Sequence, residues 1–170
     1  ALELLSKFPH LVVSRTMSKA FGLAGARLGY LAGDRAVIDA LKLVRLPYHL
    51  SAVTQATALA ALEHTSQLQE QVAHLRAERD ALVSWLSQRA YRGQPLRVAD
   101  SDSNFIWFGK FENRAELWQN LLDRGVLIRQ TGPDGWLRVS VGTAAENEAF
   151  RTALTEVLAQ DNVKRKREDG

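Results

Sequence analysis

Residues 14–30, SRTMSKAFGLAGARLGY, constrain the fold of this chain more than any other segment. Short apolar runs flank the segment at residues 11–14 and 28–32, and each run suits a buried parallel strand. The segment holds one lysine, Lys19, and three glycines, Gly22, Gly25 and Gly29, which let the backbone approach a ligand closely. Because open α/β sheets bind ligands where strand ends meet, we expect Lys19 at such an edge.

The residue types around Lys19 suit covalent catalysis on a carbonyl compound. A lysine attacks a carbonyl once its ammonium has lost a proton, and neighbouring cations, here Arg15 and Arg27, favour that loss. Thr16, Ser18 and Arg27 offer hydroxyls and a guanidinium, which bind phosphate well. If the carbonyl belongs to pyridoxal phosphate, these are the groups that its phosphate requires.

The order of residues in this loop also resembles a known family. Lys19, followed eight residues later by Arg27 within G-x-R-x-G-Y, resembles the cofactor-lysine segment of fold-type I pyridoxal-phosphate aminotransferases. The longer match, RTMSKAFGLAGARLGY, is most similar to histidinol-phosphate aminotransferases. PYHLS, SNFIWF, GVLIRQ and LRVSVGT then follow in the order of that family, so the resemblance extends from about residue 11 to about residue 158.

This resemblance implies a site and a reaction. Lys19 would hold pyridoxal 5'-phosphate covalently and act as general base and acid, with Thr16, Ser18 and Arg27 at the cofactor phosphate. The substrates would be the amino donor histidinol phosphate and the acceptor 2-oxoglutarate, in histidine biosynthesis. The full-length enzyme would be a homodimer.

Other functions stay open at this point. Aromatic amino-acid aminotransferases and threonine-phosphate decarboxylases of the same fold have lysine segments that look alike. Outside enzymes, the alternative is a catalytically silent half-chain that acts as an assembly domain.

The implied fold class is α/β, the C-terminal part of a fold-type I transferase. It comprises the end of the large parallel-sheet cofactor domain and a small α+β domain. The family has a glycine-rich turn, a ring-stacking aromatic and a pyridine-nitrogen Asp before this point, so we expect the isolated chain to be inactive. We interpret the start at Ala1 as truncation, proteolysis or a split gene. The expected division is a large-domain remnant at 1–46, a linker and interdomain helix at 47–91, the small domain at 92–160 and a disordered tail at 161–170.

Capping patterns locate the first helices. Asp34 is predicted to cap a helix that Pro47 ends, and Ser51 to cap an Ala-rich helix through Glu63. A longer amphipathic helix is predicted at about residues 67–90.

Beyond residue 92, the order β-α-β-β-α predicts a compact α+β domain. In its first strand, Phe105 and Trp107 fall on one face and Ile106 and Phe108 on the other, so we expect both faces to be covered. The strands are expected at residues 104–109, 126–129 and 136–141, and the capping boxes at Asn113-x-x-Glu116 and Thr143-x-x-Glu146.

Two arginines of this domain are candidate substrate ligands. Arg138 shares a strand face with Trp136 and Ser140, and a guanidinium in mid-strand suits a bidentate grip on a carboxylate. In the resembled family the arginine of LR-x-x-x-G has this role. Arg129, which ends VLIR, matches the position that the family uses near the substrate phosphate. A solvent-facing arginine is the alternative for both.

Weaker candidates are Asn104 and Tyr48. Asn104, at a strand start, could contact a carboxylate or serve as a turn residue. Tyr48, in the PYHLS linker, could reach a ligand or pack at a domain junction. No metal site is predicted, because the spacings of His49, His64 and His74 do not suggest one.

Composition bounds the function further. The 46% hydrophobic and 24% charged content is typical of a globular protein, and no apolar run approaches the roughly 20 residues of a membrane span. Zero cysteines exclude disulfides and thiolate metal sites. The net charge of +3 comes partly from the terminal KRKRED and does not indicate nucleic-acid binding. A cytoplasmic location is the expectation.

Overall fold

The computed structural model describes the backbone of residues 1–168 and the side chains of residues 1–163. The chain forms two compact units, Ala1–Val72 and Ala73–Gly170, and the division falls within the long helix α3 (Thr65–Ser87). The four-part division expected from the sequence stays a prediction. Within the described part of the chain, no helix is long and apolar enough to cross a membrane.

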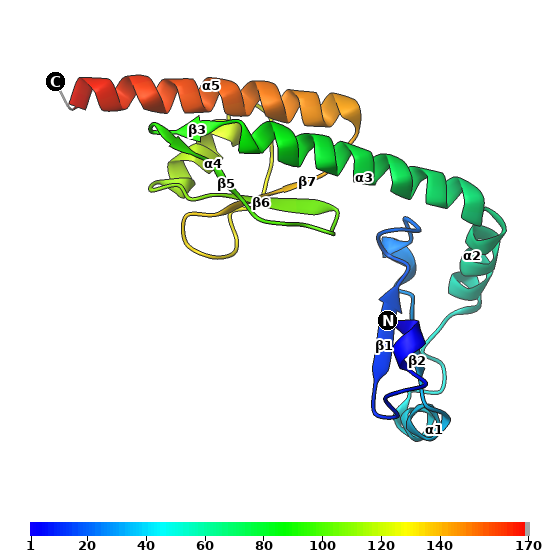
Figure 1. The fold of residues 1–170 in the computed structure, drawn as a ribbon. Coiled ribbons are helices and arrows are strands. Elements are labelled where there is room, and N and C mark those ends of the chain that lie inside the picture. Colours follow the sequence, from blue (N-terminus) through cyan, green and yellow to red (C-terminus); the bar gives the residue numbers. More distant parts are fainter. Residues whose placement is uncertain (169–170) are drawn as a thin grey trace. The chain divides into compact units, whose positions relative to one another are not determined.

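The first unit contains a two-stranded sheet and two helices (Figure 1). Its elements are η1 (Leu2–Leu4), β1 (Val12–Thr16), η2 (Ala24–Ala26), β2 (Gly29–Gly33), α1 (Arg35–Val44) and α2 (Ala52–Glu63). β1 and β2 pair antiparallel, from Val12 opposite Gly33 to Thr16 opposite Gly29, so the prediction of parallel strands is wrong for this pair. A parallel pair needs a crossover, usually a helix, whereas residues 17–28 form a loop with one short 3-10 turn.

Side-chain caps begin both helices of this unit, as predicted. Asp34 Oδ1 accepts a hydrogen bond from Ala36 N (2.8 Å) at α1, and Ser51 Oγ accepts one from Thr54 N (3.0 Å) at α2. α1 ends before Pro47, also as predicted. Several large apolar side chains of this region are exposed: Leu43, Val44, Leu46, Val53 and Leu59.

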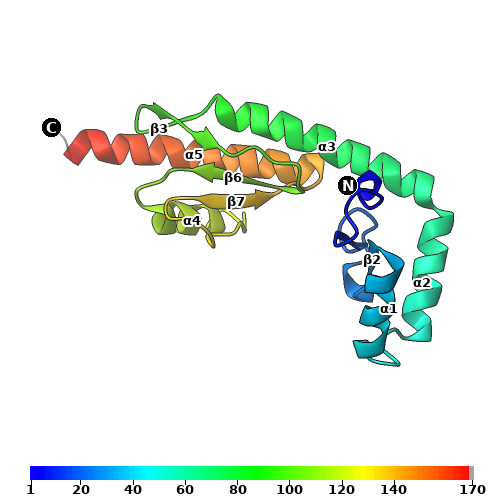
Figure 2. The same cartoon turned by 60° about the horizontal axis from the view of Figure 1, so that its bottom comes forward.

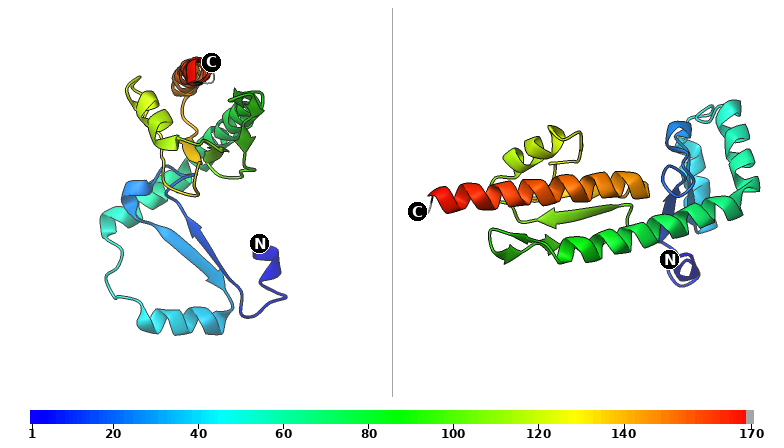
Figure 3. Two further views of the ribbon diagram at one scale, coloured as in Figure 1. Left: turned by 90° about the vertical axis from the view of Figure 1, so that its left-hand side faces the viewer. Right: turned by 90° about the horizontal axis from the view of Figure 1, so that it is seen from above.

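The second unit packs helices against one face of a three-stranded antiparallel sheet of order β5-β6-β7 (Figures 2 and 3). These helices are α4, α5 and the C-terminal part of α3. In the register of β6 and β7, Trp107 lies opposite Arg138 and Phe108 opposite Leu137. The elements are β3 (Ala90–Tyr91), β4 (Gln94–Pro95), β5 (Arg97–Val98), β6 (Phe105–Gly109), α4 (Arg114–Leu122), β7 (Leu137–Ser140) and α5 (Ala144–Glu168).

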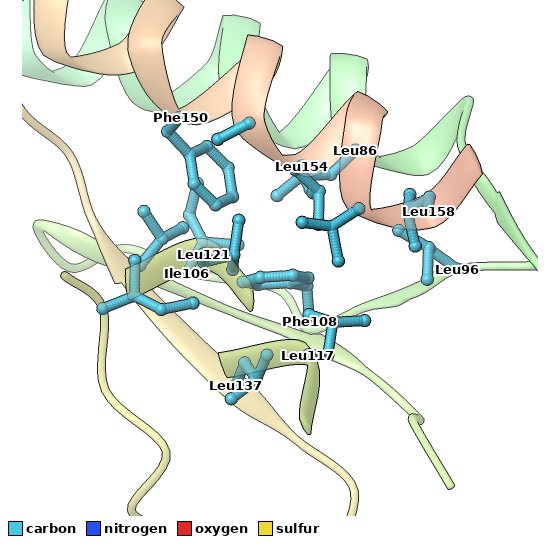
Figure 4. Packing of buried hydrophobic residues seen from close by; sticks show 14 of the residues in the cluster. Leu86, Leu96, Ile106, Phe108, Leu117, Leu121, Leu137, Phe150, Leu154 and Leu158 are labelled. Carbon is cyan, nitrogen blue, oxygen red and sulfur yellow. The ribbon is translucent and has the colours of Figure 1, made fainter. Parts of the chain in front are cut away.

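The hydrophobic core lies between that sheet face and the helices (Figure 4). Phe108 of β6 is fully buried and makes edge-on contacts with Phe111 and Phe150, with ring centroids 5.7 Å apart in each pair. Leu121 of α4 and Leu154 of α5 are also fully buried in this cluster. Because burying each such side chain contributes about 1.5–3 kcal/mol, this cluster stabilises the second unit.

The opposite face of β6 is only partly covered. Ile106 and Phe108 are fully buried on the core side, whereas Phe105 and Trp107 are half-buried. The expectation that both faces are covered therefore holds for one face alone. On the second face, the rings of Phe105 and Trp107 therefore stay partly accessible.

Residues 126–129 do not form the predicted strand. A single β-bridge joins Arg129 to Arg138, with Arg129 N donating to Arg138 O (3.0 Å) and Arg138 N to Arg129 O (2.8 Å). At the start of the segment, Val126 N donates to Leu121 O of α4 (3.0 Å). Val126 N is thus bonded to the preceding helix and is not available to pair with a neighbouring strand.

α5 extends further than expected. It includes residues 161–168, where the sequence predicted a disordered tail, while residues 169–170 lie outside the described residues. Lysine, arginine and glutamate are good helix formers, and adding residues to an existing helix avoids the cost of nucleation. The charged composition therefore favours continuation of the helix as far as Glu168.

Glu146 caps the N-terminus of α5. Its Oε2 accepts hydrogen bonds from Thr143 N (2.7 Å) and Thr143 Oγ1 (2.8 Å), which hold the pKa of Glu146 below its ordinary range. Thr143 Oγ1 in turn accepts from Glu146 N (3.3 Å), so the predicted capping box is confirmed. A lowered pKa adds stability above the unfolded-state pKa, and this contribution is lost as the pH falls through the folded-state value.

We expect Glu146→Gln to lower the free energy of unfolding at neutral pH and to have little effect at acid pH, where the wild-type carboxylate is protonated. Urea unfolding of the chain over a pH series measures both. Glu148→Gln, on the same helix with its carboxylate near Arg151 (3.4 Å), is the matched control. A destabilisation by Glu146→Gln that is constant across the pH series would contradict this role of the carboxylate.

Candidate functional site

Thr16 and Ser18 lie together at the end of β1. Thr16 Oγ1 donates to Ser18 Oγ (2.9 Å) and accepts from Ser18 N (3.1 Å). Thr16 is exposed and Ser18 is half-buried. The two hydroxyls form a small polar cluster that precedes Lys19 in the chain and is accessible to a ligand.

Lys19 is exposed on a loop that is held by its own backbone. Met17 N donates to Leu28 O (3.1 Å), Leu23 N to Met17 O (3.1 Å) and Gly22 N to Lys19 O (3.0 Å). The side chain of Met17 is buried and anchors the loop. The loop therefore has a fixed start and leaves the amine of Lys19 accessible.

Arg27 ends this loop in a strained conformation. Its φ of 52° lies in the left-handed region, which costs a non-glycine residue about 1–2 kcal/mol. Its Nη1 donates to Ala24 O (3.4 Å), and the side chain is exposed. Such strain is typical of functional sites, where the surrounding structure holds a side chain in a required direction.

Gly29 allows β2 to begin close to β1. A Cβ added at Gly29 would lie 2.6 Å from the backbone oxygen of Arg15, which is closer than real Cβ contacts. A larger residue here would separate the two strands at the end that carries Thr16 and Arg27. The glycine thus keeps the two ends of the lysine loop together.

The donor set of this loop suits an organic phosphate with a reactive carbonyl. Two hydroxyls and a guanidinium are phosphate ligands, and an accessible primary amine is a nucleophile toward a carbonyl. All of the predicted cofactor residues, Thr16, Ser18, Lys19 and Arg27, lie in the first unit. Among the described side chains, those of residues 1–163, no group of three His, Cys, Asp or Glu could hold a metal ion.

Arg138 lies on the half-covered face of the sheet in the second unit. Its guanidinium carbon is 4.6 Å from the ring centroid of Phe105 and 5.8 Å from that of Trp107. Its Nε is buried and has no hydrogen-bond partner among the described residues. The sequence placed Trp136 beside Arg138, but the rings over the guanidinium come from β6. Sequence alternation put Phe105 and Trp107 on one face, and only the register of β6 and β7 brings that face to Arg138.

Arg129 joins Arg138 at a groove. The two residues share the β-bridge described above, and the side chain of Arg129 is exposed. Both line an open groove of about 890 Å³, together with Asn147 and Phe150 of α5. The structure therefore brings these two predicted substrate residues into one groove.

The two weaker candidates gain less support. Asn104 is half-buried; its carbonyl accepts from Val141 N (2.9 Å) and its Oδ1 from Ser103 Oγ (3.5 Å), as a residue that joins β6 to the end of β7 would. Tyr48 is 98% exposed between α1 and α2. Ligand roles for both stay predictions.

Sequence reasoning missed Asn147, a buried polar residue that lines this groove. Its side chain is 2% exposed; Nδ2 donates to Glu78 Oε2 of α3 (2.8 Å), and Oδ1 accepts from Gly142 N (3.0 Å). Asn147 thus fixes the groove wall between β7 and α5 to α3. An asparagine one residue beyond a capping box carries no sequence signal of burial.

Comparison with known proteins identifies relatives. The family of class I and II aminotransferases matches residues 1–154. Histidinol-phosphate aminotransferase of Bifidobacterium adolescentis is 57% identical over 159 residues, which are 93% of this chain and 41% of the relative. The protein of the same name from Streptomyces avermitilis is 60% identical over 161 residues, 95% of this chain and 42% of the relative. The chain thus spans 41–42% of the length of these curated relatives.

A solved structure agrees in fold. The crystal structure of histidinol-phosphate aminotransferase from Sinorhizobium meliloti in complex with pyridoxal-5'-phosphate has a TM-score of 0.69 and 27% identity, and covers 94% of this chain and 44% of that chain. This likeness confirms the predicted fold class, and the relatives confirm the resemblance that the lysine loop carried. With a family match over residues 1–154, the chain belongs to the class I and II aminotransferases.

Proposed function

We propose that this chain supplies the cofactor lysine and the small domain of a pyridoxal-phosphate-dependent aminotransferase. The proposed reaction exchanges the amino group between histidinol phosphate and 2-oxoglutarate. One observation carries the proposal: the exposed Lys19 follows a hydroxyl pair in a chain 57–60% identical to relatives named for this activity.

The loop residues fit the cofactor chemically. Thr16 and Ser18 would donate hydrogen bonds to the phosphate, and the guanidinium of Arg27 would donate two further, charge-assisted hydrogen bonds to it. Lys19 would hold the cofactor through a covalent bond from Nζ to its aldehyde carbon. When bound, pyridoxal phosphate supplies an electron sink for bond breaking at the substrate α-carbon.

Lys19 has a second task in this proposal. Its amine, when free, would accept the proton from the α-carbon of the amino donor and later return a proton, so Lys19 would be the general base and general acid of the transfer. An accessible amine on a loop with a fixed start is suited to both tasks.

The second unit would bind the substrate. Arg138 would grip the α-carboxylate that every amino-acid substrate shares, through two parallel hydrogen bonds. Arg129, exposed in the same groove, would contact the phosphate of histidinol phosphate. Two arginines paired across one β-bridge suit a substrate or substrate pair with more than one anionic group.

The test is the substrate preference of the full-length protein. We expect amino transfer from histidinol phosphate to 2-oxoglutarate with a higher kcat/KM than from phenylalanine or tyrosine, measured as glutamate formed. Carbon dioxide release from threonine phosphate would instead indicate the decarboxylase of this fold. A full-length protein with none of these activities would overturn the proposal in favour of an assembly role.

Assembly and location belong to the same proposal. We propose a cytoplasmic homodimer, as the family resemblance implies, and an isolated chain without activity. Tyr30 and Leu31 on β2 are 53% and 50% exposed, so this strand offers an apolar surface to further polypeptide.

A further inference from the structure

The contacts of Trp107 extend from the Arg138 guanidinium to a turn of the same unit. Trp107 stands directly opposite Arg138 in the β6–β7 register. A Cβ added at Gly132 would lie 1.9 Å from Trp107 Cη2, so the backbone of this turn packs against the indole. Trp107 therefore cannot move toward Gly132 without displacing the turn.

The turn itself is held by α4. Arg114 Nη1 donates to Gly132 O (3.2 Å) and Pro133 O (2.8 Å), and Arg114 Nη2 lies 3.5 Å from Asp134 Oδ1. Arg114 is half-buried and sits at the first position of the helix. Arg114 therefore contacts the turn at Gly132, this turn contacts Trp107, and Trp107 contacts the guanidinium of Arg138.

The guanidinium of Arg138 depends on these ring contacts for its direction. Its Nε is buried and, in the described part of the chain, has no acceptor. A guanidinium over the face of an aromatic ring within about 6 Å is attracted by the ring quadrupole. Phe105 and Trp107 therefore stabilise the positive charge of Arg138 and its position.

We infer that Trp107 is a positioning residue: held by Gly132, it fixes the Arg138 guanidinium in the direction that grips the substrate carboxylate. This inference rests on the proposed function for the identity of the ligand. It assigns to Trp107 an effect on carboxylate affinity rather than on the chemical step, because the grip is the same in the bound substrate and in the transition state.

The experiment compares Trp107→Leu, Trp107→Phe and Trp136→Leu in the full-length holoenzyme. Trp136 is the matched control: it is a half-buried tryptophan next to β7, and among the described residues only the rings of Phe105 and Trp107 lie over the Arg138 guanidinium. Two quantities are measured: KM and kcat for the amino donor, and the Kd for glutarate, a non-reacting dicarboxylate, by calorimetry.

We expect Trp107→Leu to raise both KM and the glutarate Kd about 3- to 30-fold with kcat nearly unchanged, the range for loss of one cation–π contact. Trp107→Phe should recover most of the affinity, and Trp136→Leu should behave as wild type. If Trp107→Leu fails to fold, Gly132→Ala tests the same contact, because its methyl group must displace the indole. It should raise KM and Kd in the same direction.

The outcomes separate this inference from the proposed function. A full-length protein that lacks transaminase activity but binds glutarate, more weakly in Trp107→Leu, would refute the reaction and support the positioning role. Unchanged KM and Kd in Trp107→Leu, equal losses in Trp136→Leu, or no glutarate binding by the wild type would each overturn the inference.

Discussion

Lys19→Ala in the full-length protein should abolish covalent capture of pyridoxal phosphate and reduce transamination by about 10⁴-fold or more, since the amine is both anchor and proton carrier. Lys19→Arg should fail equally, because a guanidinium keeps the charge but stays protonated and does not attack the aldehyde. Borohydride reduction followed by intact mass measurement detects the captured cofactor, and turnover is measured with histidinol phosphate and 2-oxoglutarate.

Lys42→Ala is the control for this experiment. Lys42 is also an accessible lysine of the first unit, but it lies on α1 with its Nζ 2.9 Å from Asp39 Oδ1. This variant should retain both capture and turnover. Trapped cofactor mass or sustained turnover in either Lys19 variant would show that another amine holds the cofactor.

Features set by a few neighbouring residues were predictable from the sequence. The caps at Asp34 and Ser51 and the Thr143–Glu146 box each depend on a side chain reaching a backbone N–H two or three residues away. The family resemblance was readable for a similar reason, because it rests on residue types and spacing within the continuous segment 14–30. The cofactor roles of Thr16, Ser18, Lys19 and Arg27 stay predictions.

Features that depend on distant pairing were not predictable. The direction of β2 relative to β1 depends on the path of residues 17–28, and apolar strands look alike whether parallel or antiparallel. Residues 126–129 have the composition of a strand, yet Val126 N is taken by α4. The partners of Arg138 were missed likewise, because a one-residue change of register would send other side chains to its face.

Substitutions of Arg129 and Arg138 should affect different substrates, because the two arginines are proposed to bind different groups of the substrate. Arg138→Ala should weaken every amino-acid substrate, because all share the α-carboxylate, whereas Arg129→Ala should weaken histidinol phosphate far more than glutamate. Removing one partner of a desolvated charge pair costs about 2–5 kcal/mol, which is roughly 30- to 5,000-fold in kcat/KM. The effect at Arg138 belongs at the upper part of this range because its Nε is buried, while Arg129 is exposed and more screened by solvent.

The measurement is kcat/KM of the full-length enzyme for histidinol phosphate and, in the reverse direction, for glutamate. Arg97→Ala, at an exposed arginine of β5, is the control and should leave both values unchanged. Equal losses of kcat/KM for the two substrates in Arg129→Ala would show that Arg129 does not contact the substrate phosphate and that its guanidinium faces water. Unchanged glutamate kinetics in Arg138→Ala would exclude Arg138 as the carboxylate ligand, since glutamate must present its α-carboxylate to the same group.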